Sequence, residues 1–443
     1  MRCVPDEMLQ CEMDTRRRSE ALGLILICGV GRSGTTALMS ALASSPDVAF
    51  QRAYPYEHRY LTYMASLAVY LARPHLGHFS VEDLDIVTFP DRFVPVHWNG
   101  GHLNAGLFED WFPALWSVAS RHWALGPARA YAEKANPWLS PLLRRYWPSH
   151  SAIHSVYLFR DPRDIYGSAM AFMKRMGHVA FARRETDTDL DYAVRLCAGC
   201  LDLYMTYKEE LLADSGTIAC IRYEDFVNSG PSTFCQAITS RTGAEFDIAA
   251  IPNHLTEHKT SPSLEESIGR YRSDSLSHPV LSAVEVVLEE PMRALGYLLE
   301  TEPTRREMRI HGKSSIAIAS TDGEIEFGPS DATVTLSGED FWIVLADSEV
   351  AAADFPYALL SVSGGTGTHC SLYWRHAGEE FSEERCLHIN YTPMPNWTSL
   401  VFALVHHSLW YGIIAQLRVD LFNGPVSPNQ PGRVRSLTML TIS

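Results

Sequence analysis

The chain lacks any hydrophobic run long enough to cross a membrane. The longest apolar stretch near its N-terminus, residues 22–30, is only strand-length, whereas a transmembrane helix needs roughly 20 apolar residues. Residues 1–20 contain no apolar signal-peptide core before a small-residue cleavage site, so we interpret them as a tail. These absences predict a cytoplasmic protein without a transmembrane segment.

Basic residues are also scarce. The 37 Lys and Arg residues are outnumbered by 52 Asp and Glu residues, which gives a net charge of -15. A general nucleic-acid-binding protein would carry a basic face, so no nucleic-acid partner is expected. A few Arg and Lys side chains can still form a local positive pocket for an anionic ligand.

Short-spaced cysteine pairs are nearly absent from the chain. Among nine scattered cysteines, Cys197 and Cys200 alone have C-x-x-C spacing, and they lie in an apolar-periodic helical segment. Without a second such pair, buried free thiols are favoured over a zinc site. The scatter suits a reducing compartment.

The length of 443 residues predicts two domains, and the first alternates strand and helix patterns between residues 21 and 303. Short apolar runs that alternate with longer helical patterns predict a three-layer α/β domain with a central parallel sheet. The expected strands are 24–28, 154–159 and 217–222, and the expected helices are 35–44, 164–175, 192–212 and 281–295.

The pattern changes beyond the polar segment 301–310. Residues 311–443 contain short β-type runs separated by turn clusters and little helix, which predicts an all-β sandwich of jelly-roll type. The expected strands are 316–318, 333–336, 341–345, 358–362, 371–374, 399–405, 413–419 and 436–442.

A glycine-rich turn, residues 29–36, joins the first expected strand to the first expected helix. Such a turn surrounds an anion with backbone N–H groups. Gly29 and Gly34 have the spacing of a Walker A loop, but Thr35 stands where that loop requires lysine, and the cation is Arg32. A P-loop kinase or NTPase is therefore a weakened alternative.

The segment 31–36 (GRSGTT) resembles the 5'-phosphosulfate loop of the sulfotransferases that use 3'-phosphoadenylyl sulfate (PAPS), in a form common in bacteria. The resemblance implies PAPS as donor, PAP as product and no metal requirement. It implies that Arg32 stabilises charge electrostatically, since a guanidinium stays protonated. The implied donor-binding residues of this loop are Gly31, Arg32, Ser33, Gly34, Thr35 and Thr36.

A second anion site is expected where strand 154–159 ends. Arg160 follows that strand and Ser168 stands eight residues further on, in the next helix. A cation and a hydroxyl so placed can converge on one anion. In the family that the loop resembles, such a pair binds the 3'-phosphate. The alternative is a surface ion pair of Arg160 with Asp161 or Asp164.

Two weaker resemblances extend the donor site. The segment at Tyr223 is similar to the family's late-strand segment near the adenine, and residues 258–271 are similar to the C-terminal donor-binding loop of bacterial members. This loop implies donor contacts from His258, Thr260 and Ser261. His254 and His258 also have metal-ligand spacing, but no third ligand is apparent, so loop histidines are favoured.

Sulfuryl transfer also needs positive charge over the moving group. Lys134 lies in a segment, AEKAN, that resembles the E-K-x-x-N segment of heparan-type N-sulfotransferase domains, whose lysine serves the reacting sulfonate. The resemblance implies that role for Lys134. The alternative is a solvated surface lysine.

The expected general base is Glu57, 25 residues after Arg32, near where the family commonly places a catalytic Glu. Burial among Tyr54, Tyr56 and Tyr60 is expected to raise its pKa. Two alternatives remain open. Glu57 could instead pair with Arg59 or Arg52, and the base could instead be a histidine: His58, His97 or His102.

The acceptor is predicted from aromatic residues and from the second domain. Residues 94–108 could line an acceptor pocket, and the sandwich resembles modules of bacterial glycan-processing proteins. Four of its rings are candidates for stacking on sugars: Tyr373, Trp374, Trp397 and Trp410. We therefore expect transfer of a sulfuryl group to a hydroxyl or amine of a glycan or glycolipid, with a catalytically inactive glycan-binding protein as the alternative.

Overall fold

The computed structural model describes residues 22–50, 52, 56–71, 112–116, 128–147, 153–247, 261, 263–273, 276–310, 312–365, 369–391, 396–423 and 431–442. The chain forms two compact units. One comprises Met1–Arg160 and Tyr207–Ile268, and the other comprises Asp161–Thr206 and Gly269–Ser443. Within the described ranges, no helix is both long enough and apolar enough to cross a membrane.

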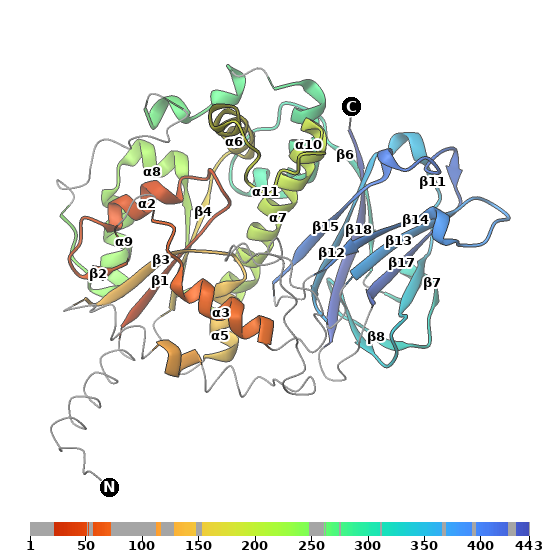
Figure 1. Ribbon diagram of the computed structural model, residues 1–443, viewed down its shortest axis with the longest axis horizontal. Helices are drawn as coiled ribbons and strands as arrows, with labels where there is room; N and C mark the ends of the chain where they lie inside the picture. The colour runs from red at the N-terminus through yellow and green to blue at the C-terminus, as the bar shows by residue number, and fades with distance from the viewer. Residues whose placement is uncertain are drawn as a thin grey trace, which may run out of the picture. The chain divides into compact units, whose positions relative to one another are not determined.

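The first unit is built on a five-stranded sheet in the order β2-β3-β1-β4-β5, in which every neighbouring pair is parallel (Figure 1). This confirms the predicted parallel sheet. The strands are β1 Gly23–Cys28, β2 Val48–Ala49, β3 Ala130–Ala135, β4 Ile153–Phe159 and β5 Ile218–Arg222.

Helices cover both faces of this sheet. Helices α2, α8 and α9 pack in one apolar cluster with alternate residues of β1, β3 and β4, and α3 and α5 contact each other on the opposite side (Figure 1). The bounds of these helices are α2 Thr35–Leu42, α3 Tyr60–Leu71, α5 Leu139–Tyr146, α8 Tyr223–Ser229 and α9 Ser232–Thr242.

The second unit contains a sandwich of antiparallel sheets, as predicted. One sheet has the order β14-β13-β17-β10-β7, the other has the order β15-β12-β18-β9-β8, and β6 adds to β18. The strands are β6 Thr304–Arg309, β7 Ile316–Ala319, β8 Gly323–Phe327, β9 Ala332–Leu336, β10 Trp342–Leu345, β11 Val350–Ala351, β12 Tyr357–Gly364, β13 His369–Arg375, β14 Cys386–Asn390, β15 Thr398–Ala403, β16 Ile413–Ile414, β17 Gln416–Asn423 and β18 Gly432–Thr441.

Helices α6 (Pro162–Met176), α10 (His278–Val287), α11 (Glu289–Ala294) and the first part of α7 (Asp189–Ala213) belong to the same unit as the sandwich. Strand β12 shows how the parts pack. Ala358 and Leu360 face the core between the sheets, whereas Tyr357 and Leu359 pack in a cluster with residues of α7 and α10. Successive strand residues point to opposite faces, so β12 is apolar on both.

Several predicted boundaries are corrected by the structure. The single helix expected over 281–295 is two helices, α10 and α11, which meet at Leu288. Pro291 has no N–H to donate to the carbonyl of Val287, four residues before it, so one continuous helix is disfavoured. The strand expected over 413–419 is divided into β16 and β17. Strands β2, β3, β6, β8, β11 and β14 were not predicted, and β6 shows that sheet pairing begins at Thr304, inside the segment read as polar.

Asp191, in the first turn of α7, binds that helix to the sandwich. One carboxylate oxygen accepts hydrogen bonds from Tyr357 Oη and His406 Nε2, both at 2.8 Å. The other accepts from the backbone N–H of Thr188 at 2.9 Å and from its hydroxyl at 2.6 Å. Burial alone would raise the pKa of Asp191, but these donors outweigh it and hold the pKa below its ordinary value.

We expect Asp191→Ala to lower the free energy of unfolding by about 1–3 kcal/mol, because it leaves buried donors without an acceptor. The matched control is Asp189→Ala, at an exposed site in the same turn, where a change within about 0.5 kcal/mol is expected. Because the folded-state pKa is depressed, the contribution of Asp191 is present above the ordinary carboxyl pKa and disappears as pH falls through the folded value. Urea denaturation at pH 7 and in acid measures both effects, and equal stability of the two variants at pH 7 would contradict this role.

Candidate active site

The glycine-rich turn lies between the carboxyl end of β1 and the start of α2. Gly34 precedes the helix with φ of 105°, and its carbonyl accepts from the N–H of Ala37 at 2.9 Å. Among the described residues, no side chain caps this helix and no acidic residue lies in its first turn. The positive end of the helix dipole is therefore not neutralised locally, which favours an anion at this place.

Ser33 adds a second feature of an anion site. Its side chain is fully buried, and within the described part of the chain its Oγ has no hydrogen-bond partner. Gly29 is needed beside it, because a Cβ at Gly29 would lie 2.7 Å from that Oγ. A buried hydroxyl without a partner is costly unless a ligand supplies one, and a phosphate or sulfate oxygen fits.

Tyr223, at the start of α8, packs directly against this turn. A Cβ at Gly34 would lie only 2.3 Å from Tyr223 Cδ2, so both the close approach and the positive φ require glycine there. The Tyr223 hydroxyl lies 3.0 Å from Ser267 Oγ. The structure thus places Tyr223 at the loop, and its approach to an adenine stays a prediction.

Arg160 lies at the end of β4 beside the same turn, and it is 7% exposed. Its Nη1 donates to the carbonyl of Arg32 at 3.0 Å, its Nη2 donates to the carbonyl of Ser267 at 2.5 Å, and its guanidinium carbon lies 4.7 Å from the Tyr223 ring centre. These contacts describe a buried cation rather than the surface ion pair of the alternative. All three partners are neutral, so they leave the positive charge available to an anion. Ser168 is buried within α6, in the second unit.

Lys134 joins the loop to the expected base. This residue of β3 is 4% exposed, and its Nζ donates to Thr36 Oγ1 at 2.8 Å and to Glu57 Oε1 at 2.5 Å. The other carboxylate oxygen of Glu57 accepts from Arg59 Nη2 at 2.8 Å. Three residues singled out from the sequence therefore meet, and the solvated surface lysine of the alternative is ruled out by burial.

The pKa expected for Glu57 was wrong in direction. Burial acts to raise it, but the attraction and hydrogen bonds of Lys134 and Arg59 outweigh burial and lower the pKa of Glu57. Burial lowers the pKa of Lys134, and Glu57 opposes that change. The effect of burial does not prevail because the carboxylate pairs with two cations. Arg52 binds backbone carbonyl groups instead.

Glu133, adjacent to Lys134 in β3, is a site residue that sequence reasoning missed. It is 1% exposed and accepts from the N–H of Leu61 at 2.8 Å, from the N–H and hydroxyl of Thr62 at 3.0 and 2.7 Å, and from Tyr131 Oη at 3.1 Å. Burial raises its pKa to about 7, against the effect of these donors. Glu133 thereby anchors the first turn of α3, which follows directly on Glu57 and Arg59.

Several predicted residues lie outside the part that the structure describes. Two others are described: Ser261 is half-buried, and His58 is exposed beside Tyr60. The remaining candidates, whose roles stay predictions, are outside the described residues: Tyr54, the acceptor-pocket segment 94–108 with His97 and His102, His254, His258 and Thr260.

The predicted role of the sandwich aromatics is corrected. Because these rings are buried, they cannot present a flat face to a sugar from solvent: Tyr373, Trp374, Trp397 and Trp410. Trp374 and Trp410 belong to the sandwich core, where large apolar surface is most stabilising. Tyr373 and Trp397 are instead each covered by an arginine, Arg418 and Arg433. Cys197 is a buried free thiol, as expected, and Cys200 is a half-buried one.

Comparison with known proteins gave a family match over half of the chain. The profile of the sulfotransferase family matches residues 25–247. The sulfotransferase domain from the curacin biosynthetic pathway is 15% identical, covers 63% of this chain and 99% of its own, and has a TM-score of 0.36. A sulfotransferase from Alicyclobacillus acidocaldarius is 16% identical, covers 61% and 97%, and has a TM-score of 0.33. A family 29 carbohydrate-binding module from Piromyces equi is 16% identical, covers 32% and 92%, and has a TM-score of 0.23. No curated protein matched the chain.

We expect Gly34→Ala to destabilise the loop, because the new Cβ meets the Tyr223 ring and the left-handed backbone costs about 1–2 kcal/mol. The unfolding midpoint should fall. Gly199→Ala in α7 is the matched control, since its Cβ meets nothing within 4 Å, and it should leave the midpoint unchanged or raise it. A Gly34→Ala protein as stable as wild type would show that the loop does not need this conformation.

Proposed function

Because the chain belongs to the sulfotransferase family, we propose that it transfers a sulfuryl group from PAPS to a hydroxyl or amine of an acceptor. One observation carries the proposal. Buried Lys134 reaches both the carboxylate of Glu57 and Thr36 of the glycine-rich turn, residues 29–36, which we call the anion loop. A cation and a base therefore lie at the edge of one anion site. Group transfer of this kind needs positioned charge and a base more than covalent catalysis.

The residues of the loop fit the donor. Residues 31–36 would hold the 5'-phosphosulfate of PAPS, because the buried Ser33 hydroxyl and the uncapped start of α2 supply hydrogen-bond donors there. Buried Arg160, with Ser168, would hold the 3'-phosphate. PAPS supplies an activated sulfuryl group whose leaving group is a phosphate, and Arg32 would stabilise the charge that develops there.

Glu57 would act as the base. Its lowered pKa keeps it ionised at neutral pH, and each carboxylate oxygen retains a lone pair beyond its bonds to Lys134 and Arg59. The proton leaves the acceptor hydroxyl or amine for Glu57 as oxygen or nitrogen attacks sulfur. Lys134 supplies positive charge beside the same carboxylate. Glu133 holds the turn that follows, so it is a positioning residue.

A glycan or glycolipid acceptor is part of the proposal. The four rings first considered are buried, so they do not support a glycan acceptor, and the support from the sandwich comes from one exposed ring. Tyr411 is 55% exposed, and its ring centre lies 5.0 Å from that of His376. An exposed aromatic face beside a polar ring can contact a sugar.

Ligand-induced stabilisation tests the donor site. PAP should raise the melting temperature and ATP should not, with about 2.7 kcal/mol of stabilisation at a hundred times the dissociation constant. Arg160→Ala should abolish the shift, whereas Arg293→Ala, which removes an exposed arginine of α11, should keep it. A shift with ATP and none with PAP would overturn the proposal. Tight PAP binding without transfer to any acceptor would indicate an inactive glycan-binding protein.

Glu57→Gln should retain the PAP-induced shift and reduce transfer by about 10²–10⁴-fold, as expected for loss of a general base. Transfer is measured as PAP released from PAPS over a panel of glycosides and amines, with His58→Ala as the neighbouring control. Because the Glu57 pKa is lowered, wild-type activity should decline only as pH falls below the ordinary carboxyl value of about 4. Retained transfer in Glu57→Gln with loss in His58→Ala would move the role to histidine.

A further inference from the structure

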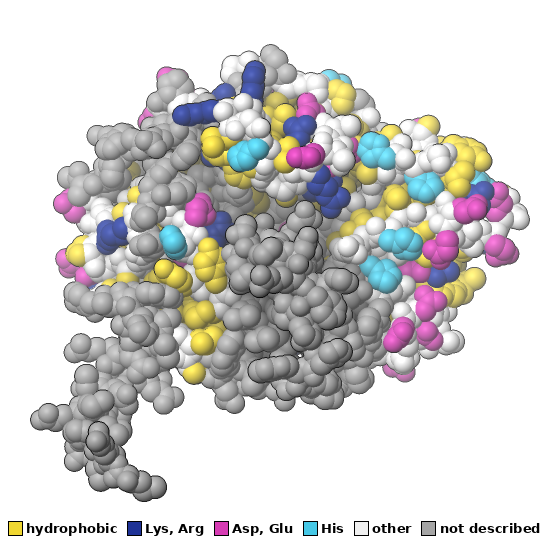
Figure 2. Space-filling model, viewed as in Figure 1, with side chains coloured by type: hydrophobic (Ala, Val, Ile, Leu, Met, Phe, Trp, Pro, Cys, Tyr) yellow, Lys and Arg dark blue, Asp and Glu magenta, His cyan; other side chains and the backbone are white. Residues whose placement is uncertain are grey.

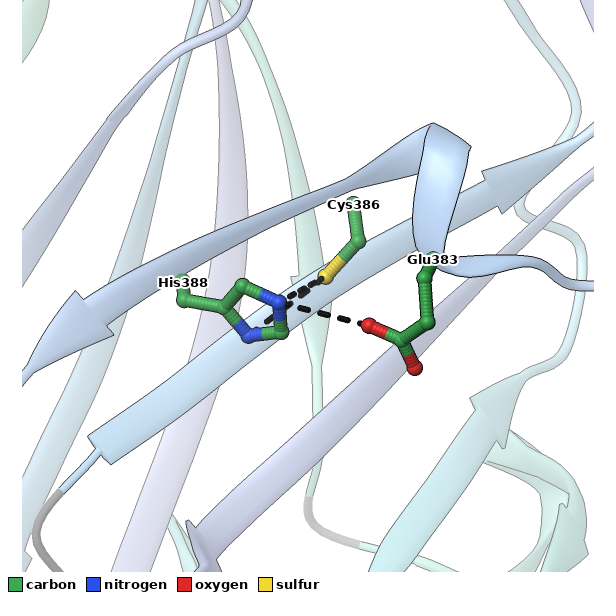
Figure 3. A group of neighbouring side chains, drawn as sticks. All are labelled: Glu383, Cys386 and His388. Atoms are coloured by element: carbon green, nitrogen blue, oxygen red, sulfur yellow. Dashed lines mark hydrogen bonds and ion pairs between the residues drawn. The ribbon is translucent and has the colours of Figure 1, made fainter.

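Three potential metal ligands meet at the edge of the sandwich, in the second unit. Glu383 lies in the short helix η7 (Glu383–Arg385), and Cys386 and His388 lie in β14, which forms the end of its sheet (Figure 3). Residues two apart in a strand share a face, so Cys386 and His388 point the same way while Leu387 and Ile389 pack against the core. Figure 2 shows histidine and carboxylate side chains gathered over this part of the sandwich.

The spacing of the three ligand atoms suits a tetrahedral ion. His388 Nε2 lies 3.5 Å from Cys386 Sγ and 3.4 Å from Glu383 Oε2, and all three ligand atoms lie within 4.8 Å of one another. Zinc bond lengths of about 2.3 Å to sulfur and about 2.0–2.2 Å to nitrogen and oxygen give tetrahedral edges of roughly 3.3–3.6 Å. The two distances from Nε2 fall within that range.

Neighbouring residues orient two of the ligands. His388 Nδ1 lies 2.7 Å from Oγ of buried Ser371, which leaves Nε2 as the ring nitrogen for an ion. Tyr373 Oη donates to Glu383 Oε1 at 2.9 Å, which leaves Oε2 for the same place. Hydrogen bonds of this kind to the far side of a histidine and a carboxylate are the usual outer support of a metal site.

The same contacts also describe a hydrogen-bonded group of side chains without a metal, and the experiment distinguishes the two. Cys386 Sγ also lies 3.7 Å from Nδ1, so in this arrangement the thiol rests against the imidazole ring. Binding a metal requires the ring to turn until the Nε2 lone pair points between Sγ and Oε2. The side chains of His388 and Glu383 are 51% and 77% exposed, which leaves room for that adjustment.

We propose that Glu383, Cys386 and His388 bind one zinc-class transition-metal ion, with water in the fourth position. A mixed sulfur, nitrogen and oxygen set selects such an ion over magnesium or calcium, which prefer oxygen alone. As the metal–sulfur bond forms, the Cys386 thiol releases its proton to solvent, so thiolate and carboxylate balance the two positive charges of the ion. The ion connects η7 to the end strand β14.

Cobalt titration of the full chain, prepared without a histidine tag and treated with a chelator, tests the site. One equivalent of Co²⁺ should produce a thiolate-to-cobalt charge-transfer band, and Zn²⁺ should displace it and raise the melting temperature. Cys386→Ser should lose the band, whereas Cys220→Ser, which removes an exposed thiol of β5, should keep it. Ser371→Ala should weaken cobalt binding by roughly 10–100-fold.

Glu383→Gln guards against a folding artefact, because this exposed side chain can change without unfolding the sheet. It should keep the metal-free melting temperature and bind cobalt more weakly. No charge-transfer band in the wild type, or a band that survives Cys386→Ser, would overturn the proposal and leave the cluster as a hydrogen-bonded group only. None of the residues proposed to bind PAP is a ligand of the metal, so the PAP-induced shift should persist in either case, and this proposal and the proposed function fail separately.

Discussion

The candidate active site depends on satisfying one buried ammonium group. Taking a charged lysine out of water is costly unless other groups compensate it, and Lys134 is compensated by Thr36 and Glu57. Thr36 belongs to the first turn of α2, and Glu57 lies in the segment before α3. Their positions along the chain differ widely from that of β3, so these contacts exist only when the sheet, the loop and the segment before α3 are all in place. Lys134 also brings to the anion loop the lysine charge that a Walker A loop carries at the position of Thr35.

Two adjacent charged residues in buried strand β3 require polar partners on both faces of the sheet. Because strand residues alternate, Lys134 points toward the side of α2, and Glu133 points toward the side of α3. Glu133 meets four donors there, two of them backbone N–H groups at the start of α3. A strand whose sequence is AYAEKA is stable in the interior only because each charge finds such partners. The hydrogen bonds of Lys134 hold Glu57 itself, and those of Glu133 hold the start of α3 that follows it.

Local patterns predicted much of this structure, and long-range pairing explains what they missed. The anion loop was predictable because glycine conformations and helix starts are set by neighbouring residues, and parallel strands were predictable from apolar runs. Strand β3 was missed because its two charges interrupt the apolar pattern. The lowered pKa of Glu57 depends on Lys134, 77 residues away, which no local pattern reveals. Glu383, Cys386 and His388 were overlooked because a C-x-x-C search does not detect an E-x-x-C-x-H spacing.

The packing of the sandwich also limits which of its surfaces are open to a ligand. On strand β12 the side chains on one face fill the core, while those on the other, including Tyr357 and Leu359, pack with α7 and α10. The hydrogen bond from Tyr357 to Asp191 adds a polar connection to that packing. The β12 sheet is therefore covered at this point on both faces, unlike a sheet that leaves one face to solvent. The helices thus close the β12 surface to a ligand, whereas Cys386 and His388 point to the outer face of the other sheet. The proposed metal ion would thus lie on the sheet face that α7 and α10 leave uncovered.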